Sequence, residues 1–203
     1  MILLAAGASS RLGRAKQLLD YNGQSFLKHM ISTVESAGLT SLIVVLGANA
    51  SSLSAEADGK HIDVVINAGW QEGIASSIRC GIIAMQNRYP ACDGALILVC
   101  DQPYITVDLI NQLIRVQKKS GKPIAASAYE NIAGTPAIFH QSFFTELTSL
   151  QGDKGAGKIL KQVPDSIATV DFPLGRFDID TQEDYDNWKA NLIPHKAGEN
   201  EEM

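Results

Sequence analysis

The sequence predicts an α/β fold in which a mostly parallel sheet is covered by helices on both faces. Short, almost continuously apolar runs have the length and composition of strands buried on both faces. They alternate with longer segments whose apolar residues recur every three or four positions, as they do in amphipathic helices. Such alternation of strand and helix is typical of parallel sheets.

The first half of the chain follows this alternation closely. Apolar runs predict strands over residues 2–6, 41–47, 62–68 and 95–100. A helix is expected from Phe26 to Ala37, with Gly38 as its C-terminal cap, and another from Ile74 to Met85.

The second half is less regular but continues the pattern. A helix is predicted over 106–119, followed by strands over 123–129 and 136–139 that the Gly134-Thr135-Pro136 sequence separates. Helices are then expected over 143–150 and 155–163, a strand over 167–172 and a last helix over 181–191. Thr181, with Asp184 three residues later, suits the N-terminus of that helix. We expect one domain over residues 1–194 and a disordered polar tail over 195–203.

The composition argues against several classes of protein. The 203 residues are 45% hydrophobic, enough for a substantial core, and the net charge of -5 does not suit a protein that holds nucleic acid by its phosphates. No apolar run approaches the roughly 18 residues of a membrane span, and Gly7 and Arg11 follow the apolar start at once, unlike a secretory signal. The three cysteines lack disulfide-framework or zinc-ligand spacing. We therefore expect a cytoplasmic protein with neither nucleic-acid nor membrane partners.

A glycine-rich, basic loop follows the first predicted strand. In an open parallel sheet, ligands gather at the carboxyl ends of the strands, which is where this loop begins. Gly7 and Gly13 allow the backbone to approach a ligand closely, and Arg11 and Lys16 supply charge that suits phosphate oxygens. The loop matches neither a Walker A motif nor a dinucleotide-binding motif. Its alternative interpretation is a surface loop with solvated cations.

Carboxylates follow two further predicted elements. Asp101 ends the strand over 95–100, and Asp178 and Asp180 stand two residues apart before the last helix. Magnesium prefers one or two carboxylates together with phosphate oxygens and water, so Asp101 and one of this pair could complete such a site. The alternative is that these aspartates cap helices or turns.

Two more loops carry candidate ligand-binding groups. Gly73 and Ser77 lie where the strand over 62–68 passes into a helix, and could read a base or sugar edge, while Trp70 suits packing as well as stacking. A second glycine-rich turn over 151–158 bears two lysines and could hold a phosphate or remain a solvated loop. The four histidines show no ligand spacing.

The motifs together resemble the MocA-like molybdenum cofactor cytidylyltransferases of the MobA-like NTP transferase family. The matching segments run in family order across nearly the whole chain: LAAGASSRLGRAK at 4–16, NAGWQEGIASSIRCG at 67–81, CDQP at 100–103, LQGDKGAGKIL at 150–160 and DIDTQEDY at 178–185. The resemblance implies a three-layer α/β/α Rossmann-like fold of the nucleotide-diphospho-sugar transferase type, with a mostly parallel mixed sheet.

The resemblance also implies a reaction and a set of site residues. The terminal phosphate of molybdopterin attacks the α-phosphate of CTP, molybdopterin cytosine dinucleotide forms and pyrophosphate leaves. Arg11, Lys16 and Asp101 are expected to be catalytic, and Mg²⁺ to be held by Asp101, Asp178 and Asp180. Nucleotide contacts are expected from Leu4, Ala5, Ala6, Gly7, Ser9, Arg11, Gly13, Lys16, Gly73 and Ser77, and acceptor contacts from Gly152, Asp153, Lys154 and Lys158.

The choice of substrates rests on fewer residues. By resemblance, the LAAG form favours CTP, because the methyl group of Ala6 replaces a glycine of guanylyltransferases and would crowd a purine. The family's cation after the Gly-Asp pair is missing or displaced at Gly157, and the Gly134-Thr135-Pro136 sequence also departs from the family. Transfer from GTP or to a sugar or alcohol phosphate, and a non-catalytic cofactor carrier, remain alternatives. A molybdoenzyme or its chaperone is a possible transient partner.

Overall fold

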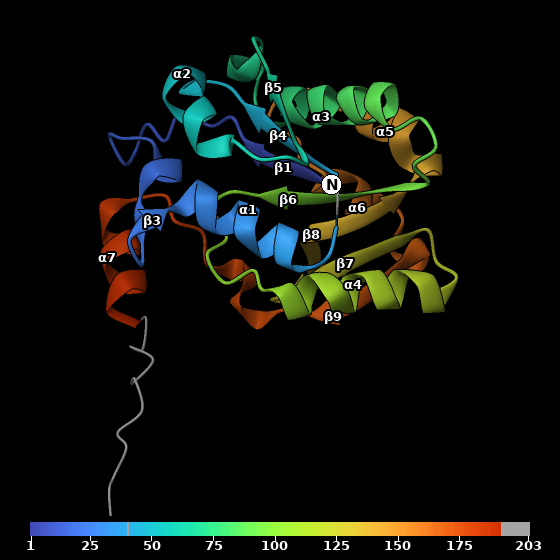
Figure 1. Cartoon of the computed structure of the whole chain (residues 1–203). Coiled ribbons are helices and arrows are strands. Elements are labelled where there is room, and N and C mark those ends of the chain that lie inside the picture. Colours follow the sequence, from blue (N-terminus) through green and yellow to red (C-terminus); the bar gives the residue numbers. More distant parts are fainter. Residues whose placement is uncertain (40, 192–203) are drawn as a thin grey trace, which may run out of the picture.

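The protein is built on one seven-stranded mixed sheet. A computed structural model describes residues 1–39 and 41–191, so the tail predicted over 195–203 lies outside the described residues (Figure 1). The strands lie in the order β5-β4-β1-β6-β8-β7-β9. Their bounds are Ile2–Ala5 for β1, Leu42–Leu46 for β4, Ile62–Ile66 for β5, Gly94–Val99 for β6, Ile124–Tyr129 for β7, Ile132–His140 for β8 and Ile167–Asp171 for β9.

The pairing of the strands agrees with the predicted mostly parallel sheet. β1 pairs in parallel with both β4 and β6, and β4 pairs in parallel with β5. β8 runs antiparallel to β6 and β7, whereas β7 and β9 are parallel. The one reversed strand makes the sheet mixed.

Helices cover both faces of the sheet (Figure 1). Their bounds are Phe26–Ser36 for α1, Ala50–Leu53 for α2, Ile74–Arg88 for α3, Val107–Ser120 for α4, Phe144–Thr148 for α5, Gly157–Gln162 for α6 and Gln182–Asn191 for α7. Ser25 caps α1 by accepting a hydrogen bond from the Lys28 amide, and Thr106 caps α4 in the same way. Gly121, at a φ of 67°, ends α4.

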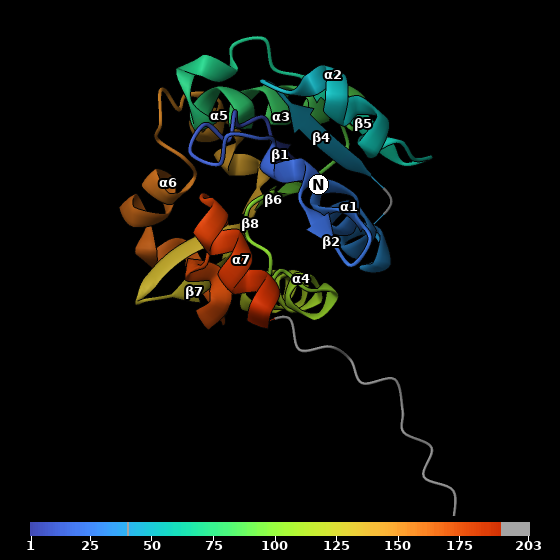
Figure 2. The same ribbon diagram turned by 90° about the vertical axis from the view of Figure 1, so that its left-hand side faces the viewer.

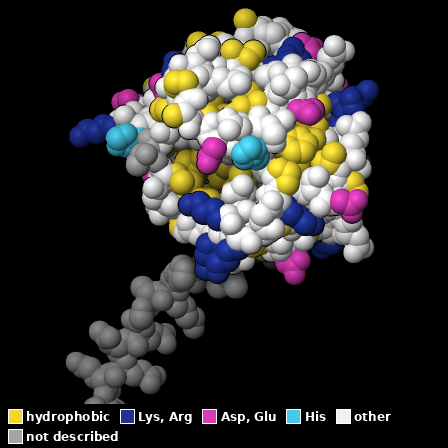
Figure 3. Space-filling model, turned by 90° about the vertical axis from the view of Figure 1, so that its right-hand side faces the viewer, with side chains coloured by type: hydrophobic (Ala, Val, Ile, Leu, Met, Phe, Trp, Pro, Cys, Tyr) yellow, Lys and Arg dark blue, Asp and Glu magenta, His cyan; other side chains and the backbone are white. Residues whose placement is uncertain are grey.

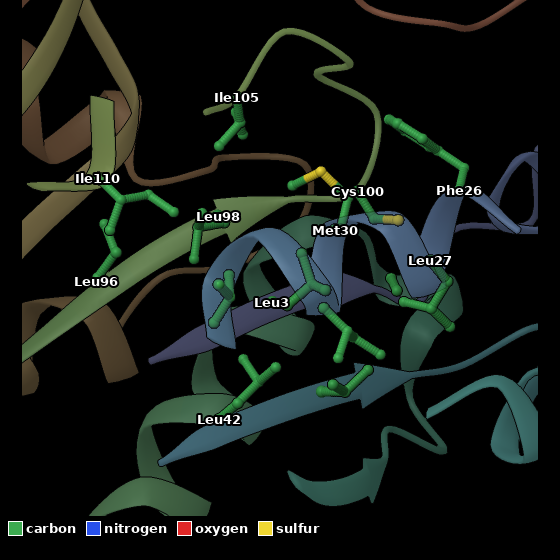
Figure 4. Packing of buried hydrophobic residues seen from close by; sticks show 14 of the residues in the cluster. Leu3, Phe26, Leu27, Met30, Leu42, Leu96, Leu98, Cys100, Ile105 and Ile110 are labelled. Atoms are coloured by element: carbon green, nitrogen blue, oxygen red, sulfur yellow. The ribbon is translucent and has the colours of Figure 1, made fainter. Parts of the chain in front are cut away.

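Alternate residues of the central strand enter two separate cores. Leu3 and Ala5 pack with α1 and α4, whereas Ile2 and Leu4 pack with α3. Figure 4 shows the first of these cores, where Leu3 and Leu98 of the sheet face Met30 of α1. Because both faces are covered, every residue of β1 is buried, which explains its uninterrupted apolar sequence.

The structure differs from the predicted elements at three places. β8 runs through Gly134-Thr135-Pro136, which the sequence predicted as a break, and the Thr135-Pro136 bond is cis. The strand tolerates this proline because a register shift opposite Ala126 and Ser127 leaves Pro136 outside the paired residues. A short hairpin of β2 (Asp20–Tyr21) and β3 (Gln24–Ser25), and the single-turn α2, were not predicted.

No described helix combines the length and the apolar character needed to cross a membrane.

Candidate active site

The order of the strands fixes where a ligand is expected. From β1 the chain moves outward to β4 and β5, and then returns to place β6 on the other side of β1. Such a reversal leaves a crevice between the carboxyl ends of the two central strands, which is the usual ligand site of open α/β sheets. A cleft of about 360 Å³ opens there, lined by the ends of β1 and β6 and the start of α3. Figure 2 looks onto this edge of the sheet, with α7 in front.

The predicted phosphate loop leaves β1 and borders the cleft. Ser9, at a φ of 55°, accepts a hydrogen bond from the Lys16 amide through its Oγ at 3.0 Å, so its side chain shapes the loop. Gly13 adopts a φ of 71°, a conformation that favours glycine.

Gln17 supports this loop from below, a role that sequence reasoning missed. Its side chain is buried, and its Nε2 donates to the carbonyl oxygens of Ala5 at 2.9 Å and Gly7 at 3.2 Å. The position of a polar residue beside two leucines was the only signal that could have identified it.

Lys16, Asp101 and Asp180 form a charged cluster at one end of the cleft. The Lys16 Nζ lies 2.8 Å from Asp101 Oδ2 and 3.1 Å from Asp180 Oδ1. Arg11 Nη2 lies 2.8 Å from the other oxygen of Asp180, with the Arg11 side chain 72% exposed and that of Lys16 only 13%. The fold thus brings together four candidate residues from distant parts of the sequence.

The segment before α7 brings Asp180 to this cluster. The Ile179 amide donates to the Asp101 carbonyl oxygen at 3.0 Å, which fixes the segment beside the end of β6. Asp184 Oδ2 accepts hydrogen bonds from the amides of Asp180 and Thr181, and Thr181 Oγ1 accepts one from the Asp184 amide. The helix cap is therefore made by Thr181 and Asp184 as predicted, which leaves the Asp180 carboxylate free to bind Lys16 and Arg11.

The pKa shifts reflect the concentration of charge. Burial lowers the pKa of Lys16, but the carboxylates of Asp101 and Asp180 outweigh burial and hold that pKa above its ordinary value. Burial, and then the charge of Asp101, raise the pKa of Asp178 to about 7. The protonated form of Asp178 is therefore favoured by its burial and by the neighbouring carboxylates.

The carboxylates fit a divalent ion that arrives with a nucleotide. Within residues 1–39 and 41–191, no three carboxylate, imidazole or thiol groups converge as a protein-only metal site. Asp101 and Asp180 do converge on one positive charge, the Lys16 ammonium group, and two carboxylates with phosphate oxygens and water are what Mg²⁺ takes. Asp178 lies within electrostatic reach of both.

The loop before α3 is ordered by a buried amide that was not predicted as important. The Nδ2 of Asn67 donates to Ser76 Oγ at 2.8 Å and Ser77 Oγ at 3.1 Å, while its Oδ1 accepts from the Gly69 amide. Ser77 and Gly73, two of the residues expected to contact the nucleotide, both line the cleft.

Ala6 lies at the point where three segments meet. A Cβ on Gly47 would come within 2.9 Å of Ala6 Cβ and 2.8 Å of Trp70 Cβ, so glycine is required there for close packing. Ala6 and Trp70 both line the cleft.

The predicted acceptor turn is only partly at the cleft. Asp153 lines it, but Lys154 and Lys158 do not. A neighbouring hollow of about 210 Å³ shares Leu4, Ile74 and Val99 with the cleft, and is otherwise formed mainly by residues 132–135 of β8, residues 155–157, Tyr129 and Lys161. The cation that lines this second hollow is thus Lys161, which sequence reasoning missed.

Comparison with known proteins identifies the family. Residues 1–167 match the family model of the MobA-like NTP transferase domain. The chain belongs to the MobA-like NTP transferase family. The predicted fold and the enzyme class, a nucleotidyltransferase, are thereby confirmed.

Sequence relatives and solved structures align with nearly the whole chain. The chain is 32% identical to nicotine blue oxidoreductase of Paenarthrobacter nicotinovorans over 194 residues, 90% of this chain and 92% of the relative. It is 28% identical to the purine catabolism protein PucB of Bacillus subtilis, over 91% and 93% of the two chains. The crystal structure of Rv0371c from Mycobacterium tuberculosis matches with a TM-score of 0.79 and 30% identity, over 94% and 97%. A manganese complex of Rv0371c matches with a TM-score of 0.73 and 27% identity, over the same shares of both chains.

Proposed function

We propose that this protein is a Mg²⁺-dependent cytidylyltransferase that transfers CMP from CTP to the terminal phosphate of molybdopterin. The products are molybdopterin cytosine dinucleotide and pyrophosphate. The cluster of Lys16, Asp101 and Asp180 between the ends of β1 and β6 gives the strongest support, because it joins a cation and two carboxylates at the expected ligand position. Family membership supports nucleotidyl transfer, and the composition, with its three unpatterned cysteines, supports a cytoplasmic location.

The cations of the phosphate loop would exchange carboxylate partners for phosphate oxygens when a nucleotide binds. Arg11 and Lys16 are paired with carboxylates in the free protein. A triphosphate offers stronger charge-assisted acceptors, so Arg11 would turn to the outer phosphates and Lys16 to the α-phosphate. The main-chain amides of residues 5–16 would complete the cradle.

Asp101 and Asp180, with Asp178 beside them, would hold the magnesium ion. Bound there, Mg²⁺ supplies positive charge that stabilises the transferring phosphoryl group. Nucleotidyl transfer depends on positioning and charge neutralisation more than on a protein nucleophile, so the site requires no general base among its side chains.

Base and acceptor would occupy opposite sides of the start of α3. Ala6, Gly73 and Ser77 line the cleft and would contact the base, with Ala6 favouring cytosine over guanine. The hollow beside β8, together with Gly152 and Asp153, would receive the acceptor, with Lys154 and Lys158 at its exposed rim.

A substrate panel tests the proposal. The purified protein is incubated with Mg²⁺, with CTP, GTP or ATP, and with molybdopterin or a sugar 1-phosphate, and pyrophosphate release is measured. Release from CTP and molybdopterin alone supports the proposal. Preference for GTP would contradict the role of Ala6, and activity with the sugar phosphate would contradict the acceptor.

The same panel separates other classes of function. Nucleotide binding with no pyrophosphate release from any pair would favour a cofactor carrier that delivers to a molybdoenzyme or its chaperone. The name of the Paenarthrobacter relative makes an oxidoreductase a further alternative. Reduction of nicotine blue by an added hydride donor such as NADH, without pyrophosphate release from any substrate pair, would support that alternative and overturn ours.

A further inference from the structure

A surface ion pair holds the turn over 150–155 against the start of α3. Arg79 Nη1 donates to Glu72 Oε1 at 2.7 Å and also to the Leu150 carbonyl oxygen at 2.7 Å, and its Nη2 donates to Glu72 Oε2. The same Glu72 Oε1 accepts a hydrogen bond from the Gly152 amide at 3.3 Å. One carboxylate and one guanidinium therefore bridge two segments more than 70 residues apart.

Main-chain contacts also hold the turn against the start of α3, next to this pair. The Ala75 amide donates to the Gly152 carbonyl oxygen at 3.1 Å. Gly73 has a φ of 114°, and a Cβ there would lie 2.7 Å from the Gly152 carbonyl carbon and 2.3 Å from Asp153 Oδ1. The absence of a side chain at Gly73 is what allows the turn to approach so closely.

The seated turn completes the wall of the cleft. Gly73, Ile74 and Ser77 line the cleft from the start of α3, and Asp153 lines it from the turn. A Cβ on Gly155 would lie 3.5 Å from Ile74 Cγ2, so the turn and the helix also meet beside the second hollow. A shift of the turn would therefore move Asp153 and the border between the two hollows together.

We infer that Glu72 and Arg79 are a positioning pair that sets the border between the nucleotide and the acceptor by fixing the turn over 150–155. The inference rests on the proposed nucleotidyl transfer. Side chains of Glu72 and Arg79 are 41% and 27% exposed, and ion pairs this accessible contribute little to global stability. The bidentate geometry of the pair does fix the orientation of the two side chains, and through them the position of the turn. This position matters because reactions between bound groups are sensitive to displacements of about 1 Å.

The test compares two arginines of the same helix. Arg88, near the C-terminal end of α3, pairs with Asp63 of β5 at 3.0 Å through Nε and is remote from the turn. R79A and R88A each remove one partly exposed ion pair from α3, so R88A is the matched control. E72Q and R79K keep some hydrogen bonds of the pair and provide graded variants.

Two readouts are measured on the full chain. With Mg²⁺·CTP and molybdopterin, R79A is expected to raise the KM for molybdopterin and to lower kcat/KM by about 10- to 100-fold. E72Q and R79K should fall in between, and R88A should match the wild type. Without substrates, a lysine-specific protease should cleave after Lys154 several times faster in R79A than in R88A, because the turn is released.

The outcomes separate this inference from the proposed function. A purely structural role would lower the folded fraction, and with it the apparent kcat, but leave KM unchanged. Equal KM and equal cleavage in R79A and R88A would overturn the inference. If the wild type releases no pyrophosphate, the proposed function fails, and the cleavage rates alone decide whether the pair holds the turn. If R79A does not fold, E72Q is compared with R88A instead, by the same KM and cleavage measurements.

Discussion

The two ends of the parallel strands carry hollows of similar size but different chemistry. The cleft at the carboxyl end measures about 360 Å³, and a hollow at the amino end measures about 320 Å³. The amino-end hollow is lined by apolar residues, among them Leu39, Leu96, Ile114 and Ile138, and by polar ones, with Asp93 and Lys118 as its charged side chains. Figure 3 shows this end, where charged side chains are scattered among hydrophobic and polar ones.

The convergence of charged side chains, and not volume, therefore distinguishes the candidate site. At the carboxyl end, Lys16 lies after the loop that follows β1, Asp101 lies after β6, and Asp180 lies in the segment before α7. All three meet within hydrogen-bond distance. Equivalent substitutions at the two ends therefore test whether this convergence is functional.

Replacing an aspartate at each end should give the largest contrast. Asp101→Asn keeps the shape of the side chain but removes its charge, and the loss of about 4 kcal/mol of charge stabilisation would lower kcat by roughly 1,000-fold. The change is measured as pyrophosphate release at saturating CTP. Asp93→Asn at the amino end is the control. A similar loss of kcat in both variants would show that the loss in Asp101→Asn comes from lower stability and not from a missing charge at the site.

Replacing a lysine at each end should give a smaller contrast. Lys16→Met removes the partly buried cation that faces both carboxylates, and loss of one such donor to a transferring phosphate is expected to lower kcat by about 100-fold. Kinetics and calorimetric CTP titration measure the effect. Lys118→Met should behave as the wild type, and unaltered turnover in Lys16→Met would remove Lys16 from the site.

A methyl group at Gly73 should have an intermediate effect on substrate binding. In Gly73→Ala the new Cβ meets the turn at Gly152 and Asp153, so we expect the KM for the acceptor to rise by about tenfold. Gly38→Ala is the matched control, because Gly38 has a φ of 75° but a Cβ added there would meet nothing within 4 Å. An equal rise of the acceptor KM in both variants would show that backbone strain, and not contact with the turn, causes the effect in Gly73→Ala.

Acidification should give the smallest effect, through the aromatic cluster behind α7. His29 stacks on Tyr21 with ring centroids 3.7 Å apart, and Tyr21 stacks on Trp188 of α7 at 5.3 Å. Burial lowers the pKa of His29, so the unfolded chain binds more protons below its ordinary pKa of about 6.5. Stability should therefore fall as pH drops from about 6.5 toward the lower folded pKa.

The His29 effect is measured as the difference in Tm between wild type and His29→Phe. That difference should change between about pH 7 and pH 5, because only the wild type carries the titrating ring. The same substitution at exposed His61 serves as the control. A pH-independent difference at His29 would show that docking of α7 does not depend on the protonation of this ring.

The accuracy of the sequence predictions depended on how local each signal was. Runs buried on both faces, such as β1, and caps such as Thr181 involve neighbours in sequence and were predicted correctly. Only residues 136–139 of β8 were predicted as a strand, because the continuation of β8 through Pro136 depends on a register shift against the partner strand β7. Gln17 and Asn67 were missed because their burial and hydrogen bonds arise only after distant segments pack.

The order of apolar runs was enough to predict the alternating strands and helices, and with them the carboxyl end where the glycines and cations of the first loop lie. The sequence also offered Lys16 as a phosphate-binding cation, and Asp101 with Asp178 or Asp180 as a magnesium pair. Three-dimensional packing was needed to show that Lys16 lies between carboxylates 85 and 164 positions away, and that Arg79 reaches the turn at Leu150. Apolar periodicity encodes which face of an element is buried, whereas such meetings depend on strand order and on the path of the loops.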